Sequence, residues 1–318
     1  YRASEFDGGG QGRAFKETQN YYGYTFDNIL TYNRQFGDHN ITATLLYGAI
    51  ERKYDRAFAE GIGFTRLTLG YNNLALASQQ RIQSSAWQET LLYQMGRLNY
   101  AFKDRYLLTA TLRRDGFSGF SKNNKYGTFP VLALGWIISD EKFLEKLTVI
   151  NYLKLRAGFG ATGNQTQRYA SLSNVTTNAA YVFGDGAGTA FGQFVETLGN
   201  EDLKWERTQG INIGLDFALI NNRLTGTFDF YKNETRDLLY SVAIPQATGF
   251  SNINSNLGQI DNTGFEAQLT YRIIDNRNFK WSATANFSTN KNEIVTLTGV
   301  DANGDGIVTR YETYMWEA

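Results

Sequence analysis

Apolar and polar side chains alternate over two long stretches near the end of the chain. In residues 265–273 the odd positions are apolar and the even positions polar, and residues 279–288 repeat the pattern. Successive side chains of a β-strand point to opposite faces, so each stretch predicts a strand with one apolar and one polar face. Residues 275–278 (Asp-Asn-Arg-Asn) are typical of a turn. Each strand has at least nine alternating residues, more than the usual ~5–6 and close to the ~9–11 that cross a bilayer at a tilt.

The same alternation predicts further strands along most of the chain. They lie at residues 20–36, 41–49, 85–102, 106–113, 152–161, 207–219 and 223–235. Residues 131–138 are apolar on both faces, which predicts a strand packed on both sides. Residues 140–144 predict a short helical turn, whereas 55–84, 163–204 and 238–255 lack the alternation and predict long loops.

Short turns therefore alternate with long loops, between roughly ten strands. Outer-membrane barrels show this asymmetry between their periplasmic and extracellular ends. The pattern fits an all-β, transmembrane antiparallel β-barrel, and by itself it leaves a soluble β-sheet protein open. Ten strands could close alone or form part of a larger barrel, since single-chain barrels have an even number of strands from about 8 upward.

Composition narrows the alternatives. The 31 basic and 31 acidic residues cancel, so no overall field favours nucleic acid. The 32 glycines, 2 prolines and 20 tyrosines fit strands, turns and aromatic girdles. With no cysteine the chain has neither disulfides nor thiolate metal sites, and no apolar run is long enough for a membrane-spanning helix. The chain opens at Tyr1 without a signal-peptide pattern, which predicts either a removed leader or a fragment.

Several motifs resemble one family, the SusC/RagA-like TonB-dependent outer-membrane transporters of Gram-negative bacteria. They occur in the family's order, in residues 96–100 (GRLNY), 106–116 (YLLTATLRRDG), 127–130 (GTFP), 135–141 (GWIISDE), 153–160 (LKLRAGFG), 163–165 (GNQ), 200–206 (NEDLKWE), 222–224 (NRL), 231 (Y), 237–239 (DLL), 248–250 (TGF) and 262–266 (NTGFE). Because the resemblance extends over about residues 85–295 and keeps the family's order, chance similarity is a poor explanation.

The resemblance implies a barrel of about 22 strands with long extracellular loops, a plug domain and a TonB box. It also implies TonB-dependent import of an oligomeric nutrient, a glycan or peptide, with a SusD-like lipoprotein lid and without enzymatic activity. We expect residues 1–318 to be part of the barrel, with the plug and TonB box absent from this chain. The expected surroundings are outer-membrane lipid and the oligosaccharide or peptide substrate. A soluble β-sandwich or barrel that binds carbohydrate is the alternative, because it also needs alternating strands.

Residues 301–312 (DANGDGIVTRYE) match the twelve-residue calcium loop. The expected ligands are Asp301, Asn303, Asp305, the carbonyl of Ile307, Thr309 and Glu312. Calcium prefers six to eight oxygen ligands, which such a loop supplies at alternate positions. The alternative is a turn whose carboxylates are solvated.

Five aromatic residues in the predicted long loops are candidates for stacking on a sugar ring or a peptide side chain. They are Tyr181, Phe183, Phe191, Phe194 and Phe250. Binding residues concentrate on loops held by a rigid scaffold. The same rings could instead pack the loops together or against a lid.

No catalytic constellation emerges from the sequence. His39, the single histidine, lies in a predicted turn, a poor place for a catalytic or zinc site. We expect the apolar strand faces to meet lipid and the polar faces to line the lumen. The charged residues assigned to the lumen are Arg113, Arg156, Asp216, Asp229, Glu266 and Arg272.

Overall fold

A computed structural model describes residues 12–65, 69–182 and 189–297. The chain divides into two compact units. Unit 1 comprises Tyr1–Asp27 and Gly48–Leu92, and unit 2 comprises Asn28–Tyr47 and Tyr93–Ala318. Three long strands contribute to both units: β1 (Arg13–Phe36), β2 (His39–Phe64) and β3 (Ala77–Phe102).

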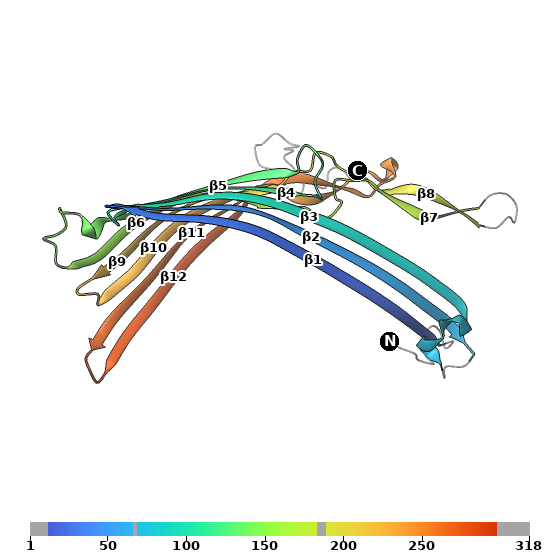
Figure 1. Cartoon of the computed structure of the whole chain (residues 1–318), viewed down its shortest axis with the longest axis horizontal. Coiled ribbons are helices and arrows are strands. Elements are labelled where there is room, and N and C mark those ends of the chain that lie inside the picture. Colours follow the sequence, from blue (N-terminus) through green and yellow to red (C-terminus); the bar gives the residue numbers. More distant parts are fainter. Residues whose placement is uncertain (1–11, 66–68, 183–188, 298–318) are drawn as a thin grey trace. The chain divides into compact units, whose positions relative to one another are not determined.

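Unit 2 contains the part of the chain that carries the motifs. Its further strands are β4 (Tyr106–Phe117), β5 (Tyr126–Ile137), β6 (Ile150–Asn164), β9 (Glu206–Leu219), β10 (Leu224–Ala243), β11 (Asn252–Asp275) and β12 (Lys280–Thr296). Ten strands follow one another in the order β1-β2-β3-β4-β5-β6-β9-β10-β11-β12 (Figure 1). The pairs whose register is defined in this sheet, from β4 to β12, are all antiparallel. A separate ribbon pairs β7 (Asn174–Val182) with β8 (Thr189–Thr197).

The connections differ between the two ends of the strands. At one end, called the turn end, the links are tight except for residues 138–149 between β5 and β6, and several of them use left-handed backbone, as at Lys103 (φ 53°) and Asn221 (φ 57°). The link between β11 and β12 is closed by Asn276, whose Oδ1 accepts hydrogen bonds from the backbone N–H groups of Asn278 (3.1 Å) and Phe279 (2.8 Å).

At the other end, called the loop end, the links are longer and hold most of the short 3-10 helices, η1 (Gly70–Asn72), η2 (Leu74–Leu76) and η4 (Gln246–Thr248). The helical turn predicted at 140–144 is present as η3 (Ile138–Asp140), between β5 and β6 at the turn end. Among the described residues no helix has both the length and the apolar character needed to cross a membrane.

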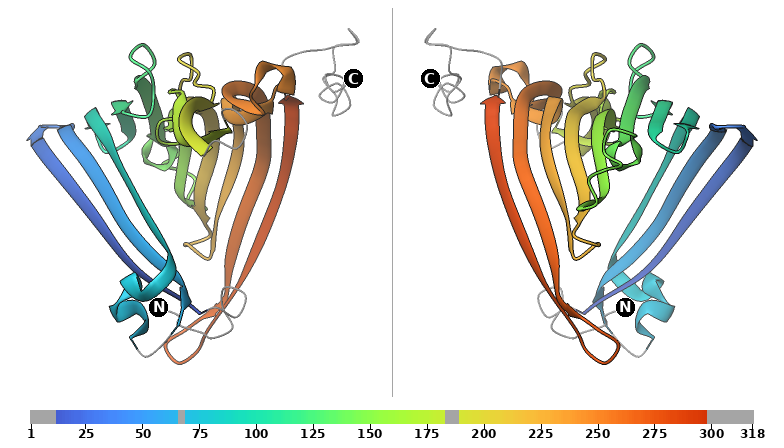
Figure 2. Two further views of the ribbon diagram at one scale, coloured as in Figure 1. Left: turned by 90° about the vertical axis from the view of Figure 1, so that its right-hand side faces the viewer. Right: turned by 90° about the vertical axis from the view of Figure 1, so that its left-hand side faces the viewer.

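The register confirms the two-faced pattern in unit 2. Cross-strand partners share a face of the sheet, and the ring centroids of Phe217–Phe228, Phe228–Phe265 and Phe265–Phe287 lie 5.4, 6.2 and 6.5 Å apart. These rings define the apolar face of β9 to β12, which lie side by side (Figure 2). The opposite, polar face carries Thr270 and Thr284, whose hydroxyl oxygens are 3.0 Å apart.

A register shift interrupts the alternation of this hairpin near its turn. The register shifts between Arg272 and Ile274, so that Ile274, not Ile273, pairs with Trp281. A β-bulge adds one residue to one strand and changes the alternation beyond it. Alternation alone therefore does not predict the cross-strand partners next to the turn.

Four other predictions need correction. The loop predicted for 238–255 is too long, because β10 continues to Ala243 and β11 starts at Asn252. The predicted loop 55–84 is wrong at both ends, because β2 continues to Phe64 and β3 starts at Ala77. The loop predicted for 163–204 contains β7 and β8. Packing on both faces of β5 is also wrong, because Leu132 and Leu134 are 45% and 51% exposed.

Polar pairing explains why the alternation fades in unit 1. Its strands are joined by ion pairs, such as Arg13 with Glu60 and the Arg52 Nη1 to Glu89 Oε1 contact of 3.1 Å. Backbone pairing thus continues where apolar alternation ends. The strands β1 to β3 are 24, 26 and 26 residues long, more than twice the ~9–11 residues of a membrane crossing.

Candidate functional site

Three charged residues meet on the polar face of β6, β9 and β10. Arg156 Nε donates to Asp216 Oδ2 at 2.9 Å and its Nη2 to Asp216 Oδ1 at 2.8 Å. The same Nη2 also donates to Asp229 at 3.1 Å. The three side chains, called the Arg156 cluster, are 32%, 25% and 22% exposed. A bidentate pair fixes the guanidinium plane, and the third contact ties β6 to β10 across β9.

Gly214 makes this bridge across β9 sterically feasible. It is the register partner of both Arg156 and Asp229. A Cβ at Gly214 would lie 2.6 Å from Arg156 Nη2 and 2.6 Å from Asp229 Oδ1. A side chain at this position would therefore displace the guanidinium from Asp229.

The other charged residues assigned to the polar face lie elsewhere on it. Glu266 is the register partner of Asp229. Arg113 donates to both carboxylate oxygens of Asp115 at 2.9 Å, and Arg272 lies 3.4 Å from Asp275. The structure thus brings three of the six predicted residues into contact and places a fourth beside them.

A shallow depression on the polar face continues from Asp229. Its polar lining consists of Thr227, Asp229, Glu266, Gln268, Asn286 and Ser288. Hydroxyl, amide and carboxylate groups together can donate and accept hydrogen bonds. This depression is a candidate contact surface for a polar ligand.

An aromatic cluster marks the turn end of β2 to β5. His39 Nδ1 lies 2.7 Å from the Tyr100 hydroxyl, and its ring centroid is 4.8 Å from that of Phe102. Tyr106 and Trp136 stack with centroids 6.5 Å apart. His39 therefore belongs to an aromatic cluster, with no catalytic partner among the residues that contact it.

Glu141 holds the polar ends of two of these rings. It accepts hydrogen bonds from the Tyr106 hydroxyl at 2.5 Å and from Trp136 Nε1 at 3.1 Å. These bonds, first that from Tyr106 and then that from Trp136, hold the pKa of Glu141 below its usual value. Rings with an apolar body and an anchored polar tip suit a membrane–water interface.

A small core at the loop end was not foreseen. Phe117, Phe120, Phe129, Leu203 and Trp205 are all at most 9% exposed, and Leu203 is fully buried. The Trp205 ring lies 5.2 Å from Phe120 and 5.6 Å from Phe129 between centroids. We call these five residues the loop core.

Hydrogen bonds fasten the same segment to β11. The Lys204 N–H donates to Asn256 Oδ1 at 2.8 Å, and Asn256 Nδ2 donates to the Lys204 carbonyl at 2.8 Å. Asn200 Nδ2 donates to the Asn254 carbonyl at 2.9 Å. The motif at 200–206 thus anchors the long connection after β6. The sequence signal that could have predicted the loop core is the pair Leu203 and Trp205, two residue types that are usually buried, in an otherwise polar segment.

Of the five candidate loop aromatics, three lie on strands, one lies in a loop and one lies outside the described residues. Tyr181 is on β7 and Phe194 on β8, 43% and 49% exposed, and Phe250 precedes β11. Phe183 lies outside the described residues, and Phe191 is described only by its backbone pairing with Ala180. Their contact with a ligand stays a prediction.

The candidate calcium ligands Asp301 to Glu312 also lie outside the described residues. Within residues 12–65, 69–182 and 189–297, no group of three or more His, Cys, Asp or Glu side chains could hold a metal ion.

Similarity to known proteins supports the sequence resemblance. Residues 1–311 match the family model "TonB dependent receptor-like, beta-barrel". The chain is 39% identical over 291 residues to the TonB-dependent receptor SusC of Bacteroides thetaiotaomicron, covering 89% of this chain and 28% of that protein. It is 38% identical over 288 residues to the TonB-dependent receptor P3 of Formosa agariphila, covering 90% and 28%.

Solved structures agree. The RagAB peptide transporter matches with a TM-score of 0.79 at 27% identity, over 92% of this chain and 32% of that chain. The outer membrane transporter YddB from Escherichia coli shares the fold, with a TM-score of 0.54 at 14% identity, over 87% of this chain and 34% of that chain. The chain spans less than a third of the length of the curated relatives it matches. It belongs to the TonB dependent receptor-like, beta-barrel family, in its SusC/RagA-like branch, and is part of a transmembrane antiparallel β-barrel in the outer membrane of a Gram-negative bacterium.

Proposed function

We propose that the protein containing this chain imports an oligomeric nutrient, a glycan or a peptide, across the outer membrane. Import would be driven by TonB, would involve a SusD-like lipoprotein lid, and would require no enzymatic step. The family membership and the similarity to SusC and to a peptide transporter support this proposal. The soluble β-sandwich alternative is wrong, because the family and fold are those of an outer-membrane barrel.

The observation that carries the proposal is the contrast between the two faces of unit 2. On the apolar face Phe287, Trp281 and Ile213 are 61%, 52% and 50% exposed. A contiguous exposed apolar surface marks contact with a membrane or another protein. The Arg156 cluster and the polar depression occupy the other face. We therefore assign the apolar face to lipid and the polar face to the lumen.

Two neighbouring residues of β11 test this assignment. Leu269 is on the apolar face, opposite Ala285, whereas Thr270 pairs with Thr284 on the polar face. Arginine on the lipid face near the membrane midplane costs about 2–4 kcal/mol. In the full-length protein, Leu269→Arg should block assembly, and Thr270→Arg should not.

Assembly can be measured as heat-modifiable migration of the protein from outer-membrane fractions. Wild-type protein and Thr270→Arg should both migrate as the folded form. Equal tolerance of the two substitutions would contradict the lipid assignment.

Uptake tests the import proposal itself. A host strain that lacks the gene should lose growth on one glycan or peptide oligomer and keep growth on the corresponding monomer. A strain without TonB should show the same defect, and a plasmid copy of the gene should restore growth. Unchanged growth on every oligomer of both classes would refute import.

Ligand contact on the polar face has its own test. We expect Glu266→Gln to weaken uptake of the identified oligomer, because Glu266 lines the polar depression beside Asp229. Glu145→Gln, which changes the same charge on the exposed connection between β5 and β6, is the matched control. Equal uptake by both variants would remove the depression as a contact surface.

Calcium binding at residues 301–312 is a separate proposal, supported by the sequence motif alone. Calorimetric titration of the full-length protein with millimolar calcium should show binding that Glu312→Gln weakens. Absence of heat in the unmodified protein would refute it.

A further inference from the structure

A band of charged residues continues the apolar face toward the loop end. Phe230 pairs with Phe265, and the next row on the same face pairs Lys232 with Thr263. The rows after it pair Glu234 with Asp261 and Arg236 with Gln259. The face that carries aromatic rings thus becomes charged within two residues along the strand.

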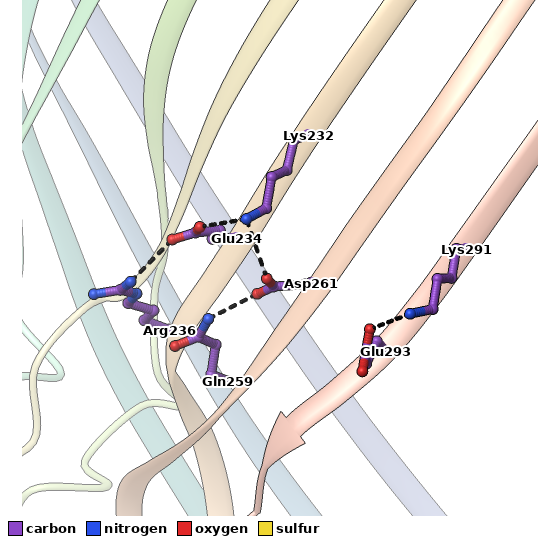
Figure 3. Close-up of polar contacts among 7 residues, drawn as sticks. All are labelled: Lys232, Glu234, Arg236, Gln259, Asp261, Lys291 and Glu293. Atoms are coloured by element: carbon purple, nitrogen blue, oxygen red, sulfur yellow. Dashed lines mark hydrogen bonds and ion pairs between the residues drawn. The ribbon is translucent and has the colours of Figure 1, made fainter.

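The same change occurs on the neighbouring strands. On β12, Lys291 and Glu293 are the partners of Thr263 and Asp261. On β9, Arg207 is the partner of Arg236. We call these eight residues the charged belt: Arg207, Lys232, Glu234, Arg236, Gln259, Asp261, Lys291 and Glu293. Figure 3 shows all of them except Arg207.

The first row of the belt lies at the depth of lipid headgroups, and the row with Arg207 and Arg236 lies two steps, about 10 Å, farther out. A two-residue step advances about 6.6 Å along a strand, or about 5 Å along the membrane normal at a tilt near 40°. The headgroup region on each side of the hydrocarbon core is roughly 5–8 Å thick. The row with Lys232 and Lys291 therefore falls within it, when Phe230 and Phe265 mark the edge of the hydrocarbon.

Within the belt, the cationic side chains are more exposed to solvent than the carboxylates that they contact. Lys232 Nζ contacts Glu234 at 3.1 Å and Asp261 at 3.6 Å, and Arg236 Nη2 contacts Glu234 at 2.9 Å. The side chains of Lys232 and Arg236 are 42% and 60% exposed, those of Glu234 and Asp261 only 30% and 19%. At the edge, Lys291 is 74% exposed beside Glu293, which is 55% exposed. The outermost groups of the belt are therefore the cations, and the carboxylates lie beneath them.

Two arginines of the belt, Arg207 and Arg236, would be stabilised by an additional negative charge. Arg207 and Arg236 are opposite each other, and like charges in directly opposed positions destabilise a sheet. Arg207 Nε is buried without a hydrogen-bond partner among the described residues. A bound anion would relieve both costs.

The turn end of the same face has a different chemistry. Tyr271, Ile274 and Trp281 extend the apolar face there. The two ends thus match two different interfaces, an aromatic one and a cationic one. Long loops mark the cationic end as the extracellular one.

We propose that the charged belt binds the phosphate groups of the lipid headgroups in the outer leaflet of the outer membrane. Lysine and arginine form charge-assisted hydrogen bonds to phosphate, and arginine can do so bidentately. The proposal rests on the lipid assignment of the apolar face made above. It adds the class of lipid and the residues that recognise it.

Native mass spectrometry of the full-length protein in detergent tests the proposal, with bisphosphorylated lipid A as the probe. The test variant is Lys232→Gln/Arg236→Gln/Lys291→Gln. The matched control is Lys122→Gln/Lys146→Gln/Arg277→Gln, which removes three exposed cations outside the belt. We expect the test variant to bind about ten-fold less lipid A, since each cation near a lipid surface contributes to attraction, and the control to bind like wild type.

Further measurements distinguish binding to the lipid phosphates from binding to the acyl chains and from binding of free phosphate. Dephosphorylated lipid A should bind equally weakly to the wild-type protein and to the test variant. Inorganic phosphate, added at the same concentration as lipid A, should not displace lipid A from the wild-type protein. Arg207→Gln alone should lower lipid A binding without lowering thermal stability in lipid-free detergent. Equal lipid A binding by test variant and control, or equal binding of phosphorylated and dephosphorylated lipid by wild type, would overturn the proposal.

Failure here is distinguishable from failure of the lipid assignment. A belt without lipid specificity would leave membrane assembly and the contrast between Leu269→Arg and Thr270→Arg intact. Loss of that contrast would instead remove the lipid assignment itself.

Discussion

Replacing Arg156 by Gln would leave Asp216 and Asp229 without their shared cation. The two carboxylates differ in geometry: Asp216 accepts two hydrogen bonds, at 2.9 and 2.8 Å, and Asp229 accepts one at 3.1 Å. Hydrogen bonds to charged groups contribute about 1.5–3 kcal/mol, whereas exposed ion pairs contribute ~0.2–1 kcal/mol. Since Arg156 is about one-third exposed (32%), we expect intermediate coupling energies, about 1–2 kcal/mol with Asp216 and about 0.5 kcal/mol with Asp229.

Double-mutant cycles on the full-length protein measure these two couplings separately. The cycles combine Arg156→Gln with Asp216→Asn and with Asp229→Asn, and unfolding in urea from lipid vesicles gives each free energy. Both cycles are then repeated in a Gly214→Ala background. This substitution should weaken the coupling to Asp229 more than that to Asp216, because its Cβ would lie 2.6 Å from both Arg156 Nη2 and Asp229 Oδ1, whereas Asp216 also accepts a hydrogen bond from Arg156 Nε.

The reasoning fails if Asp229 couples to Arg156 at least as strongly as Asp216 does. It also fails if Gly214→Ala weakens both couplings equally. Either result would mean that the guanidinium does not rest in the observed bidentate geometry.

Two other predictions concern the two ends of the strands. Leu203→Ala should destabilise the loop core by about 2–5 kcal/mol, because Leu203 is fully buried. Limited proteolysis should then cut residues 165–205 faster, while Leu172→Ala, at an exposed position of the same connection, should not have this effect. At the turn end, the lowered pKa of Glu141 means that its stabilising contribution is present above its unfolded pKa and is lost as the pH falls through its lower folded value. The hydrogen-exchange protection factors of residues 138–150, corrected for the intrinsic exchange rate at each pH, should fall on acidification below about pH 4 in wild type, and should fall less in Glu141→Gln.

The hairpin from Phe265 to Phe287 shows how much alternation can reveal. It predicted both strands, their turn and the composition of each face, and the phenylalanine ladder confirms the faces. It missed the register shift between Arg272 and Ile274 because a bulge has no hydrophobic signature of its own. It also failed in residues 55–64, where ion pairs such as Arg13 with Glu60 and Arg56 with Glu17 join the strands.

The candidate site was predictable in composition but not in arrangement. Residue type and strand parity assigned Arg156, Asp216 and Asp229 to one face. Only the register between β6, β9 and β10 brings them together, because residues 60 and 73 positions apart along the chain become neighbours. The space that permits this contact comes from Gly214, whose role depends on what lies opposite it.

The sequence by itself determined the class of protein, because strand parity and ordered motifs are local properties of the chain. It also determined which side chains share a face wherever the alternation is regular. The tertiary structure alone decided the cross-strand partners, the bulge at Arg272–Ile274, the loop core around Leu203 and the charged belt beyond Phe230 and Phe265. These features depend on register between strands distant in sequence, and register is set by pairing and turn geometry together.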